Sequence, residues 1–115
     1  NLKISNLIAK NIKPIVCVST VAELEQVKNF IEHIVVAFEP LEYIGGKEGA
    51  PVELVNEFLE KVNLQNIIYG GSVNLDNFDK YLPSSKISGL LVGSFSLNPV
   101  EFLKLIKKAN TLLQV

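Results

Sequence analysis

Four short apolar runs separated by amphipathic segments are the feature that most constrains the fold of this chain. Between the runs, apolar residues recur at the spacing of one helix face, as at Val52, Val55 and Leu59. Short apolar strands that alternate with helices are typical of a parallel sheet with right-handed crossovers. We therefore predict a single α/β domain of residues 1–115 in which one helix precedes four strand–helix units. The expected strands are residues 15–18, 34–38, 66–69 and 89–92.

Capping signals define where the helices should begin. Thr20 and Glu23 have the spacing of a capping box, and Asn98-Pro99 has the residues expected at a cap and first helical position. The expected helices are residues 2–12, 20–32, a helix from Pro51 to Val62, a short one from Asn74 to Leu82 that Pro83 ends, and a last one from Asn98. The buried stripe predicted on the last helix is Phe102, Leu105, Ile106, Ala109 and Leu113.

Composition narrows the partners that the protein can have. Hydrophobic residues make up 48% of the chain, which suggests that part of its apolar surface faces a partner. Eleven basic and twelve acidic residues give a net charge of −1, so neither nucleic acid nor an anionic membrane is an expected partner. With no run near the roughly 20 apolar residues of a membrane span and no signal-peptide pattern, we expect a soluble cytoplasmic protein.

The cysteine and methionine counts carry further expectations. A single cysteine, Cys17, excludes an intramolecular disulfide and a cysteine-based zinc site, and no metal site is predicted. Because Cys17 lies within an apolar run, we predict that it is a small buried hydrophobic residue. The chain contains no methionine, so Asn1 is not an initiator residue. We expect a processed product or a piece of a longer protein.

The loops that follow the strands contain most of the glycines. Residues 39–50, 70–74 and 93–98 hold six of the seven glycines. In α/β proteins ligands bind beside the carboxyl ends of the strands, and outward N–H groups in glycine turns can hold an anion. One Gly-Gly or Gly-Ser turn is usually only a turn. Two of them on neighbouring strands, at Gly70-Gly71-Ser72 and Gly93-Ser94, predict a phosphate site.

Glu39 is the candidate general base. It directly follows an apolar strand that Pro40 closes, and Gly45 and Gly46 make the far end of the next loop flexible. A loop that closes over the carboxylate would desolvate it, as a general base needs, although a strand-end glutamate is more often solvated or paired. His33 precedes the same strand and lies some 15–20 Å away at about 3.3 Å per residue, so we assign it a structural or solvated role.

Three motifs in this order resemble successive motifs of the triosephosphate isomerase family. They are residues 38–45 (FEPLEYIG), 68–73 (IYGGSV) and 91–97 (LVGSFSL). Their order, spacing and strand-end placement all fit that family. The resemblance covers the whole chain and corresponds to the C-terminal half of an eight-stranded (β/α)8 barrel, strands five to eight.

This resemblance implies an isomerase that interconverts dihydroxyacetone phosphate and glyceraldehyde 3-phosphate without a cofactor. Glu39 is then the base, and Tyr69 and Ser72 latch a closing lid through their hydroxyl groups. Backbone N–H groups of Gly45, Ser72, Gly93 and Ser94 hold the phosphate, and Gly71 permits its close approach. The lid consists mainly of Pro40, Leu41, Glu42, Tyr43, Ile44, Gly45 and Gly46.

The chain also departs from the family pattern. Many members have tryptophan where this chain has Glu42, and a Gly-Thr-Gly-Lys lid end where it has Gly45-Gly46-Lys47-Glu48. The usual Gly-Gly after the eighth strand is Gly93-Ser94. The family's lysine after the first strand and histidine after the fourth have no counterpart, so we expect the enediolate to be poorly stabilised and the half alone to be nearly inactive.

Four strands cannot close a barrel, so association is expected. The edge strands at residues 15–18 and 89–92 would stay open. The predicted partner is an N-terminal half with strands one to four, or a second copy of the chain in a dimer when that half is absent. Two alternatives remain open: a non-catalytic phosphate-binding half-barrel, and a structural assembly module.

Overall fold

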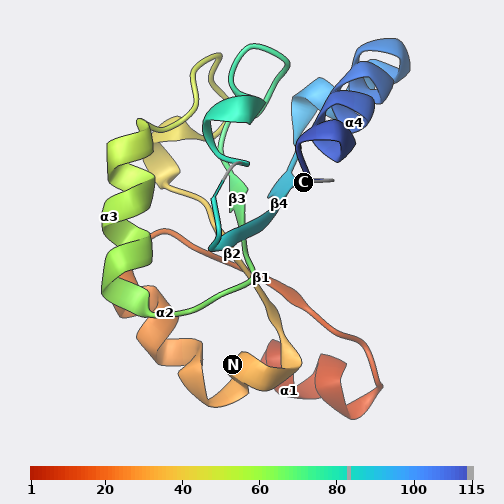
Figure 1. Cartoon of the computed structure of the whole chain (residues 1–115). Coiled ribbons are helices and arrows are strands. Elements are labelled where there is room, and N and C mark those ends of the chain that lie inside the picture. Colours follow the sequence, from red (N-terminus) through yellow and green to blue (C-terminus); the bar gives the residue numbers. More distant parts are fainter. Residues whose placement is uncertain (83, 114–115) are drawn as a thin grey trace.

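The structure, a computed structural model, contains one sheet of four parallel strands and describes residues 1–82 and 84–113. The strands lie in the sheet in chain order (Figure 1). They alternate with helices, which confirms the predicted α/β class and is compatible with half of a (β/α)8 barrel. The predicted strand bounds differ from the observed ones by at most two residues. The strands are β1 (Ile15–Val18), β2 (Val35–Phe38), β3 (Ile67–Gly70) and β4 (Ile87–Leu91).

Two predicted helix caps are present. The Thr20 hydroxyl accepts the Glu23 backbone N–H at 3.1 Å, and the Glu23 carboxylate accepts the Ser19 N–H at 2.8 Å. The Asn98 side chain accepts two N–H groups of the last helix at 3.1 and 3.2 Å. The helices are α1 (Leu2–Ala9), α2 (Val21–Val27), α3 (Val52–Val62) and α4 (Pro99–Leu113), with 3₁₀ turns η1 (Lys28–His33), η2 (Leu41–Tyr43), η3 (Phe78–Lys80) and η4 (Ser94–Leu97).

Two predicted helices are shorter than expected. The helix predicted for residues 2–12 ends at Ala9, because Asn11 adopts a left-handed φ of 60° and the N–H of Ile12 bonds back to the Leu7 carbonyl. The second predicted helix stops being α-helical at Val27 and continues as η1 to His33. α1 thus ends in a left-handed turn and α2 passes into a 3₁₀ turn, neither of which the spacing of apolar residues indicates.

The predicted helix of residues 74–82 is only the 3₁₀ turn η3. The Asn74 N–H donates to the Asn77 side chain at 2.9 Å, and the Asn74 side chain accepts the Asp76 N–H at 2.9 Å. These bonds cap N–H groups that would have no partner inside a helix. The chain then continues through i→i−3 bonds, from the Lys80 N–H to the Asn77 carbonyl at 3.0 Å and from the Tyr81 N–H to the Phe78 carbonyl at 3.2 Å. Pro83, expected to end this helix, lies outside the described residues.

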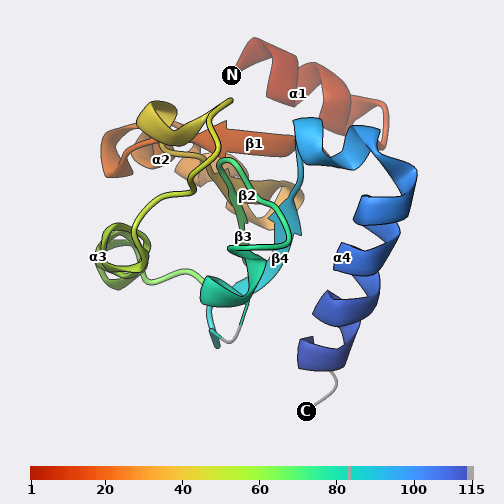
Figure 2. The ribbon, with the colours of Figure 1, turned by 90° about the horizontal axis from the view of Figure 1, so that it is seen from above.

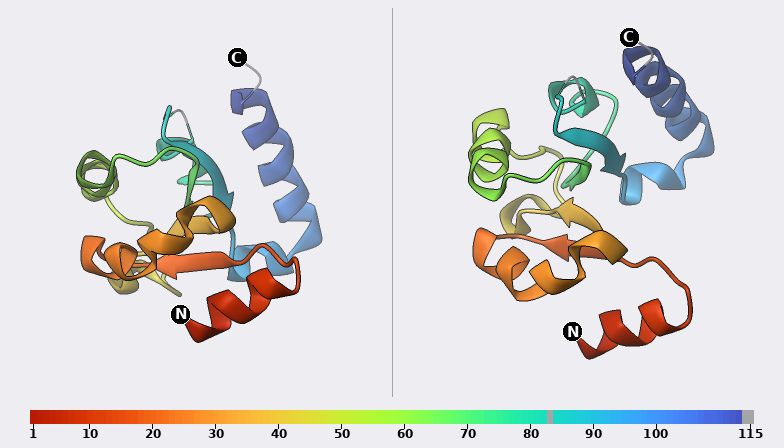
Figure 3. Two further views of the ribbon diagram at one scale, coloured as in Figure 1. Left: turned by 90° about the horizontal axis from the view of Figure 1, so that it is seen from below. Right: turned by 60° about the horizontal axis from the view of Figure 1, so that its bottom comes forward.

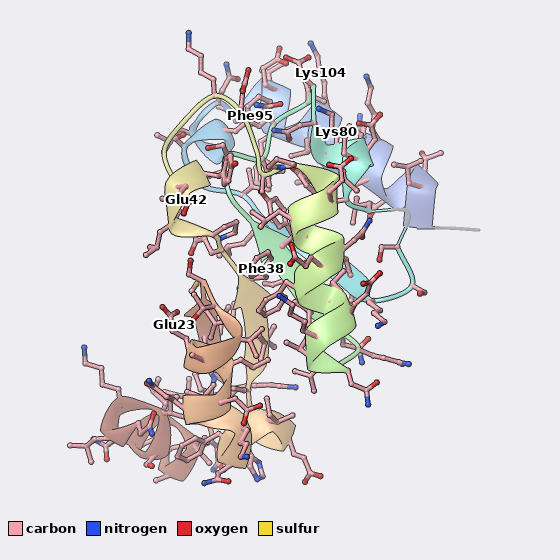
Figure 4. All side chains as sticks on the ribbon, turned by 90° about the vertical axis from the view of Figure 1, so that its left-hand side faces the viewer. Glu23, Phe38, Glu42, Lys80, Phe95 and Lys104 are labelled. Atoms are coloured by element: carbon pink, nitrogen blue, oxygen red, sulfur yellow. The ribbon has the colours of Figure 1, made fainter. Side chains whose placement is uncertain are left out.

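The core lies between the sheet and the helices that cover its outer face. The rings of Phe38 in β2 and Phe58 in α3 stack with centroids 3.9 Å apart and planes 10° from parallel, and Figure 4 shows Phe38 beneath α3. Because side chains alternate along a strand, Ala37 and Glu39 point to the opposite, inner side of the sheet. Figure 3 shows the strong twist that turns β1 and β4 into different directions.

The inner side of the sheet is open at β1. Ile15 is 54% exposed and Cys17 is exposed, whereas Val18 is buried. The prediction that Cys17 is buried is therefore wrong. Its side chain alternates with that of Val18 and lies on the side that only a closed barrel would fill.

Helix α4 is only partly covered. Leu105 is buried, and Phe102 and Ala109 are partly buried, but Ile106 is 40% exposed, contrary to the predicted stripe. Figure 2 shows the reason: α4 lies beside β4, on the far side of that strand from α3, so only one face of the helix meets the rest of the domain. The side chain of Leu113, the last residue of that stripe, lies outside the described part of the chain.

The Phe38–Phe58 stack should dominate the stability of the domain. Phe58→Ala removes a buried ring and leaves a cavity, so we expect the free energy of unfolding to fall by about 3–5 kcal/mol. Urea denaturation followed by circular dichroism measures this loss. Leu2→Ala is the matched control, since Leu2 is 76% exposed, and a similar loss for both variants would contradict the assignment of the core.

Candidate active site

One open cleft lies at the carboxyl ends of β2, β3 and β4. Its volume of about 750 Å³ is within the range of small-molecule sites. Glu39 lines it together with every residue that the sequence predicted to hold phosphate: Gly45, Gly71, Ser72, Gly93 and Ser94. The parallel sheet therefore brings three separate loops to one place.

Glu39 stands at the centre of this edge of the sheet. Its backbone N–H donates to the Val18 carbonyl at 2.9 Å and so continues the pairing of β2 with β1 by one residue. A side chain on Gly70, in the next strand, would begin 3.6 Å from the Glu39 Cγ atom and 3.3 Å from the Leu91 Cβ atom. Glycine at position 70 thus leaves room for the half-buried carboxylate.

Cys17 is a neighbour of Glu39 that the sequence analysis missed. Partial burial, followed by the Glu39 carboxylate as a hydrogen-bond acceptor and by its negative charge, raises the pKa of the Cys17 thiol to about 11. The thiol therefore stays protonated at neutral pH and can donate to the carboxylate. The parallel register pairs Val18 with Phe38, so Cys17 and Glu39 lie on the same side of the sheet. This pairing is the signal that could have identified Cys17 as a neighbour of Glu39.

The segment predicted as a lid is tied down by serine hydroxyls at both ends. At its start, the Leu41 N–H donates to the Ser19 hydroxyl at 2.9 Å. At its far end, the Ser72 hydroxyl accepts the Gly46 N–H at 2.9 Å and donates to the Tyr43 carbonyl at 2.6 Å. Ser19 was not predicted, although a small polar residue directly after β1 was a usable signal.

The middle of this segment is exposed to solvent. Leu41 is 70% exposed and Ile44 is 46% exposed, while Pro40 beneath them is buried. Figure 4 shows Glu42 at the edge of the molecule, on the short helix of the lid. Glutamate replaces the family's usual tryptophan there without burying a charge.

Tyr69 contacts the connection that follows the lid. Its hydroxyl accepts the Ala50 N–H at 2.9 Å and donates to the Gly71 carbonyl at 3.0 Å. A second tyrosine, Tyr81, donates to the Ala50 carbonyl at 2.7 Å, and nothing in the sequence pattern pointed to it. Tyr69 and Ser72 thus both bond backbone groups of residues 43–50, and their role as a latch stays a prediction.

The turn after β3 has an unusual backbone. Gly71 has a φ of 141° and Ser72 a left-handed φ of 52°. A non-glycine residue in this conformation is strained by about 1–3 kcal/mol, and such strain clusters at functional sites. The turn after β4 is more open: Gly93 and Ser94 are exposed, and Ser94 begins η4.

The side chains that line the cleft carry more negative than positive charge, so an anion would be bound mainly by backbone N–H groups. Among the described residues that line it, Lys47 is the cation, whereas Asp76 and Glu101 add carboxylates to that of Glu39. N–H groups at glycine turns can hold an anion without basic side chains. His33 is exposed at the end of η1, just before β2, and so lies at the strand end opposite to Glu39.

Residues 1–82 and 84–113 contain no group of three or more histidine, cysteine, aspartate or glutamate residues that could hold a metal ion. None of the helices described there has both the length and the apolar character needed to cross a membrane.

A twisted sheet of four parallel strands, with a carboxylate and glycine turns at its carboxyl edge, defines an α/β protein of the barrel class. Residues 1–109 match the family model described as triosephosphate isomerase. Similar proteins include the triosephosphate isomerase of Mesomycoplasma hyorhinis, 36% identical over 92% of this chain and 52% of that protein. That of Mycoplasma mobile is 37% identical over 93% of this chain and 53% of that protein. The chain belongs to the triosephosphate isomerase family, and it spans about half the length of the curated relatives it matches.

Both the backbone conformation and the surroundings of position 71 require glycine. A Cβ atom on Gly71 would lie 2.7 Å from the Tyr69 hydroxyl, and its φ of 141° disfavours any side chain. We expect Gly71→Ala to lower the free energy of unfolding by about 1–3 kcal/mol. Gly89→Ala is the control, because Gly89 lies within β4 and a Cβ atom there would meet only the Ile68 side chain, at 3.4 Å. Equal urea midpoints for the two variants would contradict the strain assigned to Gly71.

The effect of the Glu39 carboxylate on Cys17 can be measured through the reactivity of the thiol. Because a pKa of about 11 keeps the thiol protonated, alkylation by iodoacetamide should be slow at pH 8 and accelerate up to about pH 11. Glu39→Gln removes the negative charge, so the midpoint of the pH–rate curve should move to lower pH. Glu60→Gln, on the exposed face of α3, should leave the curve unchanged. An unshifted midpoint in Glu39→Gln would show that the carboxylate does not act on Cys17.

Proposed function

We propose that this chain is the C-terminal half of a triosephosphate isomerase, which interconverts dihydroxyacetone phosphate and glyceraldehyde 3-phosphate once an N-terminal half completes the barrel. The observation that carries the proposal is the meeting of Glu39 with all five residues expected to hold phosphate in one cleft. Membership of the family supports the same reaction. The reaction belongs to glycolysis and gluconeogenesis, and we expect the protein to work in the cytoplasm.

In this proposal Glu39 moves a proton between two substrate carbons. Its carboxylate takes the proton from the carbon next to the substrate carbonyl, which gives an enediolate. A proton then moves from the hydroxyl oxygen to the former carbonyl oxygen, and Glu39 returns its proton to the neighbouring carbon, as known for this family. The half-buried position of Glu39 beneath residues 40–46 suits this role. A lid over the site excludes water from the enediolate. No cofactor is required.

The phosphate group of the substrate would be held by the backbone. The N–H groups of Gly45, Ser72, Gly93 and Ser94 are the proposed donors, and all four residues line the cleft. Gly71, beside them, has no side chain to block close approach. Because Ser72 is also bonded to the lid through its hydroxyl, phosphate binding and lid position share one residue.

The rest of the site must come from another chain segment. The family's lysine after the first strand and its electrophilic histidine after the fourth have no counterpart here, and His33, the single histidine, lies at the wrong end of β2. Without them the developing enediolate is poorly stabilised. The isolated half is therefore expected to be nearly inactive.

Exposed apolar surface supports an N-terminal half as the partner. Within the described residues β1 and β4 form the two edges of the sheet. Ile15 on the inner side and Val100 and Leu103 on α4 are 54%, 63% and 50% exposed. Strands one to four would pair with both edges and cover Ile15, and the helices of that half would cover the side chains on α4. When that half is absent, a second copy of this chain is the expected substitute, giving a dimer.

Mixing this chain with an N-terminal half tests the proposal. Strands one to four of the Mesomycoplasma hyorhinis relative are a suitable partner. We expect the assembled complex to interconvert the two triose phosphates, neither half to do so alone, and Glu39→Gln to lower kcat by about 10²–10⁴-fold. Glu32→Gln, an exposed change on η1, is the control. Inactivity after demonstrated assembly, or full activity in Glu39→Gln, would refute the proposal.

A non-catalytic phosphate-binding half-barrel is the second candidate. It is favoured by one observation: both glycine turns lie on this chain, whereas the partners of Glu39 in catalysis do not. It predicts that a triose phosphate binds equally well to Glu39→Gln and that no partner restores isomerase activity. If the assembled protein binds no phosphate ligand in a titration, a purely structural assembly module is the better description.

A further inference from the structure

Ala50, at the end of the connection that follows the lid, is held on both of its backbone groups by tyrosines. Its N–H donates to the Tyr69 hydroxyl at 2.9 Å, and its carbonyl accepts the Tyr81 hydroxyl at 2.7 Å. The two rings stack with centroids 4.0 Å apart and planes 22° from parallel. Ala50 is 2% exposed. Its peptide groups cannot turn without breaking a buried hydrogen bond, which makes Ala50 a fixed point for the residues before it.

Gly49 packs against the Tyr81 hydroxyl, which leaves no room for a side chain at position 49. A Cβ atom at position 49 would overlap the Tyr81 hydroxyl and would lie 3.1 Å from both the Asn77 side-chain nitrogen and the Gly71 carbonyl. The φ of Gly49 is not in the left-handed range, so its backbone alone does not require glycine. The tyrosine hydroxyl occupies the space that a side chain would need. Gly49 and Tyr81 therefore form a matched pair.

The same group of residues continues to the Ser72 turn, which holds the far end of the lid. Asn77 is 6% exposed, and its side chain donates to the Ser72 carbonyl at 2.7 Å. Asn74 donates to the Lys47 carbonyl at 3.1 Å. Burial and the adjoining Tyr69 hydroxyl raise the pKa of Tyr81 above its ordinary value, so the hydroxyl remains a donor at physiological pH. A shift of Tyr81 would reach Ala50 directly and, through the stacked Tyr69 ring, the Gly71 carbonyl beside Ser72.

We propose that Tyr81 is a positioning residue that fixes the C-terminal hinge of the lid, and that glycine at position 49 is required because the Tyr81 hydroxyl fills that space. Tyr81 is not among the described residues that line the cleft. It acts through Ala50. The proposal rests on the proposed function only in assigning the lid to catalysis, and its structural part can be tested without any activity.

Amide hydrogen exchange, followed by NMR on the full chain, measures the hinge directly. Tyr81→Phe leaves the buried Ala50 carbonyl without its donor, and we expect the Gly46 and Ala50 amides to exchange about tenfold faster. The Ile68 amide in β3 is the internal reference for global unfolding. Tyr43→Phe is the control for these rates, since the described residues provide no hydrogen-bond partner for the Tyr43 hydroxyl. Unchanged exchange at Gly46 and Ala50 in Tyr81→Phe would overturn the proposal.

A double-variant cycle tests the matched pair. Gly49→Ala in the natural background should displace the tyrosine and accelerate exchange at Ala50. In the Tyr81→Phe background the obstructing hydroxyl is gone, so the same change should add less, and what remains should reflect the 3.1 Å approaches to Asn77 and the Gly71 carbonyl. Strict additivity of the two effects would show that the hydroxyl does not fill the space at position 49. A Gly49→Ala variant too unstable to study is informative as well, since Tyr81→Phe should then restore folding, and failure to restore it counts against the pair.

Activity in the assembled barrel gives an independent measurement. We expect Tyr81→Phe to lower kcat/KM for the triose phosphates severalfold while Glu39 keeps its pH–rate profile, because the base itself is untouched. If the assembled barrel has no activity, the proposed function fails while the exchange experiments still decide the role of Tyr81. If activity is present and the exchange rates do not change, the role of Tyr81 fails alone.

Discussion

The parallel pairing of β2 with a strand on each side is the constraint on which the rest of the structure depends. It aligns β2 with β1 and with β3, so that the chain leaves all three strands at the same edge. The Phe38–Phe58 stack holds the outer face of β2 against α3. With that face fixed, side-chain alternation directs Glu39 to the inner side. The base candidate and the glycine turns therefore meet at one edge of the sheet.

Backbone groups and hydroxyls, rather than charged side chains, organise the site. Ser72 bonds the lid at two points, and Tyr69 bonds both the Ala50 N–H and the Gly71 carbonyl. Hydroxyl groups suit this arrangement because each can donate and accept at once. The glycines allow the chain to come close enough for such bonds. The turn proposed to hold phosphate and residues 43–50 are consequently parts of one hydrogen-bonded unit, and the proposed Tyr81–Gly49 pair belongs to the same unit.

Sequence reasoning predicted the strands, the caps and the grouping of Glu39 with the glycine turns, and it failed where packing decides. Cys17 looked buried because its run is apolar, yet a half-barrel leaves its side of the sheet open. Ile106 looked like part of a buried stripe, yet α4 meets the domain on one face only. Residues 74–82 have helical spacing, but the N–H groups of Lys80 and Tyr81 bond carbonyls three residues back, so only the 3₁₀ turn η3 forms.

The sequence by itself determined the order of strands and helices, the loops that carry the chemistry and the family to which the chain belongs. These follow from local properties: the repeat of apolar residues and the φ values that glycine, proline and asparagine allow. Only the tertiary structure decided which distant residues touch. The Cys17 thiol lies beside Glu39, and the Tyr81 hydroxyl takes the place of a side chain at Gly49. Such contacts depend on strand register and close packing, which no single segment of the chain encodes.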